Sequence, residues 1–393
     1  MLRNIIRCVG LQGYNGIYSN LVTNSARTLY TVQSLGLDGY ESNRTRTKSM
    51  FSSTVDRFKE KMNNYSSEDS KNLVFSEDLK NIVHLAEKED IPLVIKMLKK
   101  FATQNSELRF GSYVFGPVIM RMFYYLQDEE TALQCFKDKS YDGIFDQWMS
   151  YQILCDMLYE KQRYQDILDV YDLIQERQIE GSMFPKHTII LVFGACYKMN
   201  TPESFKYATT LWKKMLSAGH SPMRRTVTFG AGLALAQNAP HIALEMLYNT
   251  KQQNYITVRN MKVLAMIELG RTDDVIPVLR SVLEAVGGSL TKQTFCAEIL
   301  ERVRAAVDKS DNKELKIDYD RIEKYLKENG HVSDQTINDL ICMEIDTKSM
   351  PTNNMGNKNQ TFINASFSRD NQNSRNRRPM SGRPQRPGLS EMY

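Results

Sequence analysis

Residues 150–177 read SYQILCDMLYEKQRYQDILDVYDLIQER and contain two apolar stripes at helical spacing. The first stripe is formed by Tyr151, Leu154, Leu158 and Tyr159, and the second by Ile167, Val170, Tyr171 and Ile174. Residues three and four apart share one face of an α-helix, so each stripe predicts an amphipathic helix. The polar turn Lys161-Gln162-Arg163 separates the two stripes. The stretch therefore predicts a helical hairpin.

The same two-helix pattern recurs along the chain. Second-helix stripes begin at Val94, Ala132, Ile167, Ala208, Ala243 and Val275, which are 38, 35, 41, 35 and 32 residues apart. First-helix stripes precede them near Leu79, Phe115, Tyr151, Ile189, Phe229 and Met261. Turns such as Gln127-Asp128-Glu129 and Gly270-Arg271-Thr272-Asp273 supply Gly and Asp as helix caps. A single hairpin cannot bury both of its stripes, so the hairpins must stack around a shared core. We predict an all-α, right-handed α-solenoid of about six hairpins over residues 76–290, with disordered basic ends.

Two adjacent units carry a family resemblance. Residues 147–177 resemble a pentatricopeptide repeat, and residues 208–222, which end in Ala218-Gly219-His220-Ser221-Pro222, resemble that family's second helix and its Gly-x-x-Pro exit. The tetratricopeptide alternative requires a Trp-x-x-Leu-Gly-x-x-Tyr first helix, which the chain does not contain. The resemblance extends over about residues 70–290. It implies a solenoid that binds single-stranded RNA along the first helices, one base per repeat.

The segments around the array are assigned by their composition. Residues 51–75 are expected to be a linker. Residues 291–347 are expected to cap the array with helices at Leu315–Asn329 and Ser333–Ile345. Gly330 is predicted as the C-cap of the first of these helices and Ser333 as the N-cap of the second. Residues 348–393 are rich in Asn, Arg and Pro and have no apolar period, so we expect a disordered basic tail.

The N-terminus has the composition of a targeting segment. Its first 37 residues contain Arg3, Arg7 and Arg27 but no acidic residue, and residues 1–11 can form a short amphipathic basic helix. This is typical of a mitochondrial presequence. We therefore expect residues 1–50 to be a transit peptide and disordered leader, with Arg27-Thr28-Leu29-Tyr30 suited to processing in the mitochondrial matrix. A disordered basic arm is the alternative.

Composition and charge limit the class of protein. No run of about 20 apolar residues is present, so no membrane insertion is expected. Six cysteines far apart in a long chain are unlike a disulfide framework. Residues 1–50 carry six basic against two acidic residues and residues 348–393 carry eight against two, which leaves residues 51–347 at net −5. Both ends are thus basic and the body is mildly acidic.

No constellation for catalysis is evident. The chain lacks a phosphate-cradling loop, a Cys-x-x-Cys pair and a His-Glu-x-x-His pair, and its five histidines are scattered. Gly230-Ala231-Gly232 is best explained by close helix packing, and the acidic pairs Glu129-Glu130 and Asp273-Asp274 by favourable charge at a helix start. We expect no enzymatic activity, no cofactor and no metal site.

The remaining candidates concern nucleic acid. Basic residues near the first helices that can contact phosphates are Arg121, Arg224, Arg225, Arg259 and Lys262. The tail contributes Arg375, Arg377, Arg378, Arg383 and Arg386, which suit flexible phosphate contacts or, alternatively, only solubilise the chain. At the inner-face position of the first helix we place Ile153, Ile190 and Phe229, and because isoleucine cannot hydrogen-bond a base edge, we expect weakly sequence-dependent binding.

Two functions fit this sequence. The first is an RNA-binding factor of the mitochondrial matrix that supports processing, maturation or stability of mitochondrial transcripts and hence the respiratory chain. The second is a protein-binding solenoid, an adaptor of a mitochondrial ribosomal or RNA-processing assembly, which the acidic body favours. A nuclease is a distant third. The expected partners are accordingly single-stranded mitochondrial RNA and mitochondrial ribosomal or RNA-processing proteins.

Overall fold

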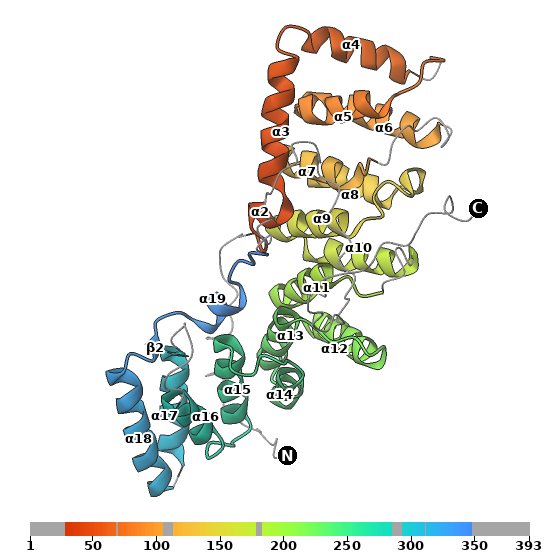
Figure 1. Ribbon diagram of the computed structural model, residues 1–393. Coiled ribbons are helices and arrows are strands. Elements are labelled where there is room, and N and C mark those ends of the chain that lie inside the picture. The colour runs from red at the N-terminus through yellow and green to blue at the C-terminus, as the bar shows by residue number, and fades with distance from the viewer. Residues whose placement is uncertain are drawn as a thin grey trace, which may run out of the picture. The chain divides into compact units, whose positions relative to one another are not determined.

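A computed structural model describes residues 28–67, 70–104, 113–177, 183–284, 293–310 and 312–347 (Figure 1). These residues are predominantly α-helical, with two strands of two residues each. Within these ranges, no helix is both long enough and apolar enough to cross a membrane. The prediction of an all-α solenoid is confirmed.

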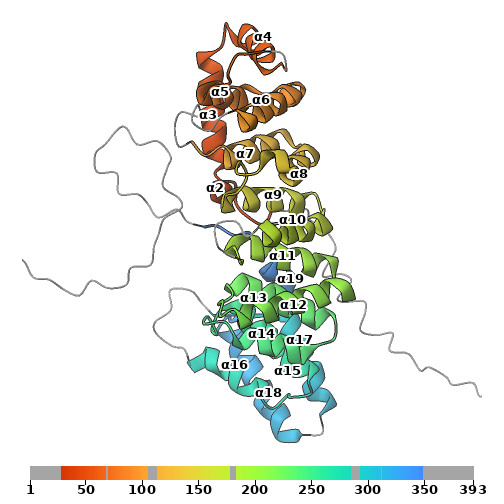
Figure 2. The ribbon, with the colours of Figure 1, turned by 90° about the vertical axis from the view of Figure 1, so that its right-hand side faces the viewer.

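Six helical hairpins make up the array. The first helices are α5 (Ser76–Leu85), α7 (Gly116–Leu126), α9 (Trp148–Glu160), α11 (Lys186–Met199), α13 (Arg224–Ala236) and α15 (Ile256–Glu268). The second helices are α6 (Ile91–Thr103), α8 (Glu129–Lys137), α10 (Tyr164–Arg177), α12 (Pro202–Ser217), α14 (Pro240–Tyr248) and α16 (Val275–Glu284). Each first helix packs against its own second helix, and successive first helices pack against each other. The hairpins follow one another as layers in chain order (Figure 2), and their buried residues form one continuous core.

The turns within the hairpins share one backbone conformation. Five of them place a residue in the left-handed region, with φ between 47° and 71°, at Gln127, Gln162, Asn200, Asn238 and Gly270. In four of these turns the following amide donates to the carbonyl five residues earlier, as Arg163 does to Leu158 at 2.9 Å. Such bonds satisfy carbonyls that the end of a helix leaves free. The expected caps are confirmed at Gly270 and at Asp128, whose side chain accepts from the amide of Thr131 at 3.1 Å.

The described N-terminal residues are helical, which differs from the disordered leader and linker that we expected over residues 28–75. They form α2 (Val32–Leu35), α3 (Leu37–Met50) and α4 (Val55–Ser66), and α3 packs against α5 and α7. The stripe of α3 that faces the array contains Tyr40, Arg44 and Thr47, all buried. Because two of these three residues are polar, no apolar period is visible in the sequence. Residues 1–27 lie outside the described part of the chain.

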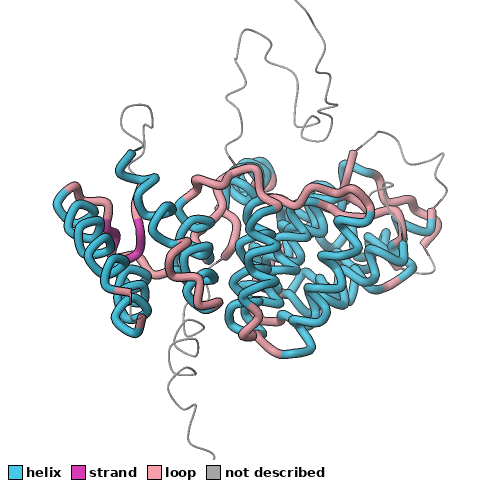
Figure 3. Tube along the Cα trace, turned by 90° about the horizontal axis from the view of Figure 1, so that it is seen from below, coloured by secondary structure: helices cyan, strands magenta, loops and turns pink. Residues whose placement is uncertain are grey.

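The end of the array is capped, but not entirely as expected. Helices α17 (Ala297–Lys309) and α18 (Lys313–Glu328) pack against each other and against α15 and α16, respectively. Strands β1 (Phe295–Cys296) and β2 (Val332–Ser333) pair in parallel (Figure 3). Gly330 ends α18 with φ of 65°, as predicted.

The helix expected over 333–345 is shorter in the structure. Ser333 belongs to β2, and a capping box of Thr336 and Asp339 starts α19 (Ile337–Ile341). Beyond α19 the main chain runs on to Ile345, which forms a parallel bridge with Tyr30. Helical hydrogen bonding there would remove the main-chain groups that make this bridge.

Candidate nucleic-acid interface

The first helices line one face of the array, and two segments of the same chain cover it. Helix α3 packs on α5 and α7, α2 packs on α9, and α19 packs on α13 and α15. Figure 1 shows α3, α2 and α19 alongside these first helices. We call residues 28–50 and 337–347 together the strap. The face that the family resemblance assigns to RNA is thus occupied by the strap.

Helix α3 is held by polar groups of its own buried side. The hydroxyl of Tyr40 donates to the carbonyl of Val83 at 2.8 Å. Arg44, only 2% exposed, donates to the carbonyls of His84 and Ala86 at the end of α5 and pairs with Glu87 at 2.8 Å. These contacts satisfy carbonyls that no helical amide reaches, so α3 acts as a cap on the C-terminal end of α5.

The turn between α2 and α3 lies against α7. Gly36 adopts φ of 68°, which an L residue with a side chain rarely takes. A Cβ at this position would lie 3.0 Å from the guanidinium of Arg121, so a larger residue would also force that side chain to shift. Arg121 in turn donates through Nε to the carbonyl of Leu35 at 2.7 Å. This arginine therefore fastens the strap to α7.

The first residues of the strap cross α9 and α11. Leu29 and Tyr30 are fully buried, and their amides donate to Oδ1 of Asp156 at 3.2 and 3.1 Å. The hydroxyl of Tyr124 donates to Oδ2 of Asp156 at 3.3 Å, and that of Tyr30 lies 3.1 Å from Nδ1 of His187. Side chains of the first helices therefore recognise the main chain of the strap.

Asp156 is a carboxyl group with no exposure to solvent. Burial raises its pKa to about 7, although the hydrogen bonds from Tyr30, Tyr124 and Leu29 oppose this effect. The titratable groups that interact with it are Tyr30, Tyr124, Cys155, Tyr159 and Glu160, and Arg225 and His187 in turn interact with Tyr30.

The C-terminal half of the strap lies on α11, α13 and α15. Arg225 donates through Nη1 to the carbonyls of Leu340 and Ile341 at 3.1 and 3.0 Å. The hydroxyl of Tyr197 donates to Oδ1 of Asn338 at 3.2 Å. As at α5, a buried arginine satisfies the last carbonyls of a short helix.

The two halves of the strap are joined to each other. The amide of Thr31 donates to the carbonyl of Ile345 at 3.2 Å, and the amide of Ile345 donates to the carbonyl of Leu29 at 2.8 Å. The amide of Thr347 donates to Oγ of Ser34 at 2.9 Å. Segments more than 300 residues apart thereby form one cover over the first helices.

The basic residues selected from the sequence are engaged inside the protein. Besides the strap contacts of Arg121 and Arg225, Arg259 is 3% exposed and donates to Oε1 of Gln293 at 2.7 Å. The guanidinium of Arg224 lies 3.4 Å from the centre of the Tyr255 ring, and Nζ of Lys262 donates to Oε1 of Gln253. Burial lowers the pKa of all five groups. We expected these side chains to contact phosphates; in the structure they contact carbonyls, amides and rings of the protein itself.

The predicted inner-face residues are also in the core. Ile153, Ile190 and Phe229 are each at most 1% exposed. They pack between helices and do not line an open groove. The five tail arginines lie outside the described residues.

The polar residues that hold the strap, above all Asp156 and Arg44, were not singled out from the sequence. Asp156 gives one signal, since it is an acid within the apolar first-helix run Ile153-Leu154-Cys155-Asp156-Met157-Leu158. A charge in such a run is buried and needs a partner. The sequence does not indicate which segment supplies that partner.

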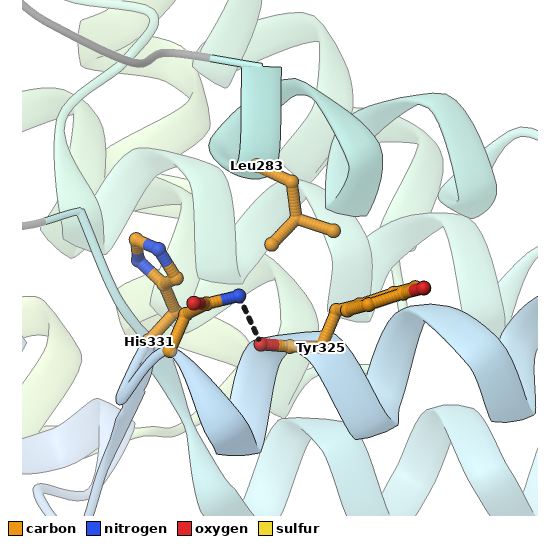
Figure 4. A pocket seen from close by; sticks show the side chains of 4 residues that line it. Leu283, Tyr325 and His331 are labelled. Carbon is orange, nitrogen blue, oxygen red and sulfur yellow. Dashed lines mark hydrogen bonds between the residues drawn. The ribbon is translucent and has the colours of Figure 1, made fainter.

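Other sites for chemistry are sparse in the described part of the chain. No group of three or more His, Cys, Asp or Glu side chains there is placed to hold a metal ion. A pocket of about 430 Å³ lies between α16 and α18 and is lined by Leu283, Tyr325, Asn329 and His331 (Figure 4). Nδ1 of His331 is 2.6 Å from the carbonyl of Gln293, so one ring nitrogen is already engaged.

Comparison with known proteins gives a consistent set of relatives. No protein-family model matches the chain. It is 30% identical over 272 residues, or 69% of its length, to the mitochondrial pentatricopeptide repeat-containing protein 2 of Mus musculus, of which it covers 70%. The protein of the same name from Homo sapiens is 30% identical over 275 residues, which are 69% of each chain. That of Xenopus laevis is 28% identical over 272 residues, 69% of this chain and 70% of the relative.

Proposed function

Because the chain belongs to the family of pentatricopeptide repeat-containing protein 2, we propose that it is a mitochondrial RNA-binding factor. It acts in the matrix, where it supports processing, maturation or stability of mitochondrial transcripts and hence the respiratory chain. It holds RNA and does not cut it. The observation that carries this proposal is the uninterrupted series of six hairpins whose first helices share one face, the architecture on which this family's RNA binding depends.

The strap determines where RNA can bind. Since residues 28–50 and 337–347 cover the first helices, RNA reaches that face only when the strap leaves it. The tail arginines provide a second route to RNA through their charge, because cationic side chains bind phosphates by releasing counterions. We therefore assign most of the affinity to Arg375, Arg377, Arg378, Arg383 and Arg386.

A salt titration of RNA binding tests this assignment. The full chain is compared with a variant in which the five tail arginines are replaced by glutamine, so that tail length is unchanged. If all five contact phosphates, replacing them lowers the slope of log K against log salt by about 3.5, at about 0.7 per contact on single strands. Two unrelated RNAs should bind with similar affinity. Equal slopes for the two proteins would show that the tail does not bind RNA.

A control must leave the strap in place. Reversing the charge of Arg225 is unsuitable, because its side chain holds the carbonyls of Leu340 and Ile341. Glutamine substitutions at the exposed, ion-paired Arg271 and Arg280 remove body charge without disturbing the strap. These variants should keep the full slope.

A protein-binding solenoid is the second candidate, and one observation favours it. The first-helix face already binds polypeptide main chain, through Asp156 to two amides and Arg225 to two carbonyls. Such contacts suit an extended segment of a ribosomal or RNA-processing protein. Crosslinking in mitochondria separates the candidates: RNA joined to the tail supports the first, and a peptide joined to the first helices without RNA supports the second.

A further inference from the structure

Asp156 is a buried acidic residue in direct contact with the strap. Among the residues that the structure describes, no basic side chain is among the groups that contact it. Its partners are two amides and one tyrosine hydroxyl, all neutral donors. A buried carboxylate is stabilised far better by a cation than by neutral donors.

One of the two strap nitrogens that contact this carboxylate can acquire a positive charge if the chain is cut before it. The nitrogen of Leu29 is 3.2 Å from Oδ1 of Asp156, which is within ion-pair distance. It is an amide nitrogen while residue 28 precedes it. If the bond between Thr28 and Leu29 were cut, the same nitrogen would be an ammonium group.

The sequence around this bond suits such a cut. Arg27 stands two residues before Leu29, at the end of an arginine-bearing leader that contains no acid. We propose that the leader is removed between Thr28 and Leu29, and that the new ammonium group of Leu29 forms a buried ion pair with Asp156. This inference rests on the mitochondrial location proposed above.

The covalent step is a hydrolysis. A processing peptidase of the matrix adds one water across the Thr28–Leu29 bond. The water oxygen completes the carboxylate of Thr28, which leaves with the leader, and both hydrogens end on the Leu29 nitrogen as it becomes an ammonium group. The cut is made on the extended, newly imported chain, so burial of Leu29 in the folded protein is no obstacle.

The strap holds the new terminus in place without residue 28. The side chain of Leu29 is 1% exposed, and its carbonyl accepts from the amide of Ile345 at 2.8 Å. The next residue is fixed by its own amide bond to Asp156 and by its hydroxyl, 3.1 Å from His187. The nitrogen of Leu29 is therefore positioned by groups that processing does not remove. Processing converts a neutral contact into a charged one and fastens the strap to the first helices.

A thermodynamic cycle with four proteins tests the pair. Residues 29–393 are compared with residues 22–393, both released from a cleavable fusion partner, and each is made with Asp156 and with Asp156→Asn. Near pH 7 the chain that begins at Leu29 should have an unfolding equilibrium constant lower by about tenfold or more than that of the longer chain. With Asp156→Asn this advantage should disappear, and the chain that begins at Leu29 should be the less stable of the two because its ammonium group is then buried without an anion. If the unfolding equilibrium constants of the two chain lengths differ by the same factor with Asp156 as with Asp156→Asn, the proposal is overturned.

A second measurement needs no substitution and remains decisive if Asp156→Asn prevents folding. In the folded 29–393 chain the amino group of Leu29 should resist acylation by an amine-reactive ester until urea unfolds the protein. The acylation rate of the same chain unfolded in urea, where the amine is exposed, serves as the control. Rapid acylation of Leu29 in the folded state overturns the ion pair.

The natural terminus provides the remaining test. Mass spectrometry of the protein from purified mitochondria should give Leu29 as the first residue. A mitochondrial protein that begins at another residue refutes this processing site but leaves the proposed location intact. Absence of the protein from mitochondria refutes the proposed function, whereas the cycle above still decides whether the ion pair forms.

Discussion

Replacing Arg225 with alanine should loosen the C-terminal half of the strap while the array stays folded. The side chain is 8% exposed and makes two hydrogen bonds, to the carbonyls of Leu340 and Ile341. A hydrogen bond from a charged group contributes about 1.5–3 kcal/mol. Removing the guanidinium also removes the cost of burying its charge, which offsets part of the loss of the two hydrogen bonds. We therefore expect the free energy of local opening of residues 337–347 to fall by about 2–4 kcal/mol.

Amide hydrogen exchange measures this opening directly. The amides of Ile345 and Thr31 report on the junction of the two strap halves, because each donates across it. A fall of about 2–4 kcal/mol corresponds to exchange that is about 30- to 1,000-fold faster at both amides. Amides in the middle of α9 and α11 should exchange at an unchanged rate, since they do not depend on the strap for their hydrogen bonds.

Arg271→Ala is the matched control. This arginine forms an ion pair with Asp274 at 2.6 Å, but both side chains are about half exposed, so its loss should cost less than about 0.5 kcal/mol. Exchange at Ile345 should not change. If Arg225→Ala left the exchange of Ile345 as slow as in the unaltered protein, Arg225 would not hold the strap and the reasoning would be refuted.

Three further changes have defined outcomes. Trp212→Ala removes a side chain that is 3% exposed and packs edge-on against Phe193. It should lower the free energy of unfolding, measured in urea, by about 3–5 kcal/mol. An unchanged unfolding curve would place Trp212 outside the core. Gly232→Ala puts a Cβ 3.0 Å from the Tyr197 ring and 3.1 Å from the Ile341 side chain. This overpacking should lower the free energy of unfolding by about 1–3 kcal/mol and speed amide hydrogen exchange in the strap. Unaltered stability would mean that the two neighbours can move apart. In a chain that retains the leader, the folded pKa of Asp156 is about 7 against an ordinary value of 3.8, so the folded state holds a proton that the unfolded chain releases. Stability relative to Asp156→Asn should accordingly fall as pH rises from about 4 to 7, and a flat difference across that window would contradict the burial of an unpaired carboxyl.

The repeats could be predicted because their stripes are apolar. The spacing of residues such as Ile167, Val170 and Ile174 reflects burial against neighbouring helices, and the six hairpins appear where that spacing placed them. Helix α3 could not be found in this way. Its buried side holds Arg44 and Thr47, and a polar residue that is buried through specific hydrogen bonds leaves no apolar period in the sequence.

The candidate site was harder to predict for a related reason. The sequence identifies Arg225 and Arg259 as cations on first helices, but their availability to phosphates depends on what lies above them. That is decided by Leu340, Ile341 and Gln293, residues 34 to 116 positions away in the chain. Contacts at such separation follow from how the whole array folds, and local patterns do not contain them.

The bridge between Tyr30 and Ile345 also constrains the order in which the protein folds. Closing a flexible loop of more than 300 residues costs about 5 kcal/mol of chain entropy, so this pairing cannot guide early folding. Hairpins built from neighbouring residues form first, because their contacts are local. Residues 29–31 are synthesised more than 300 residues before Ile345, and the bonds between their main chain and that of Ile345 can form only after Ile345 has been made. Until residues 337–347 have been made, α13 and α15 lack the cover that α19 gives them, and the arrival of this segment is the step that closes that part of the face.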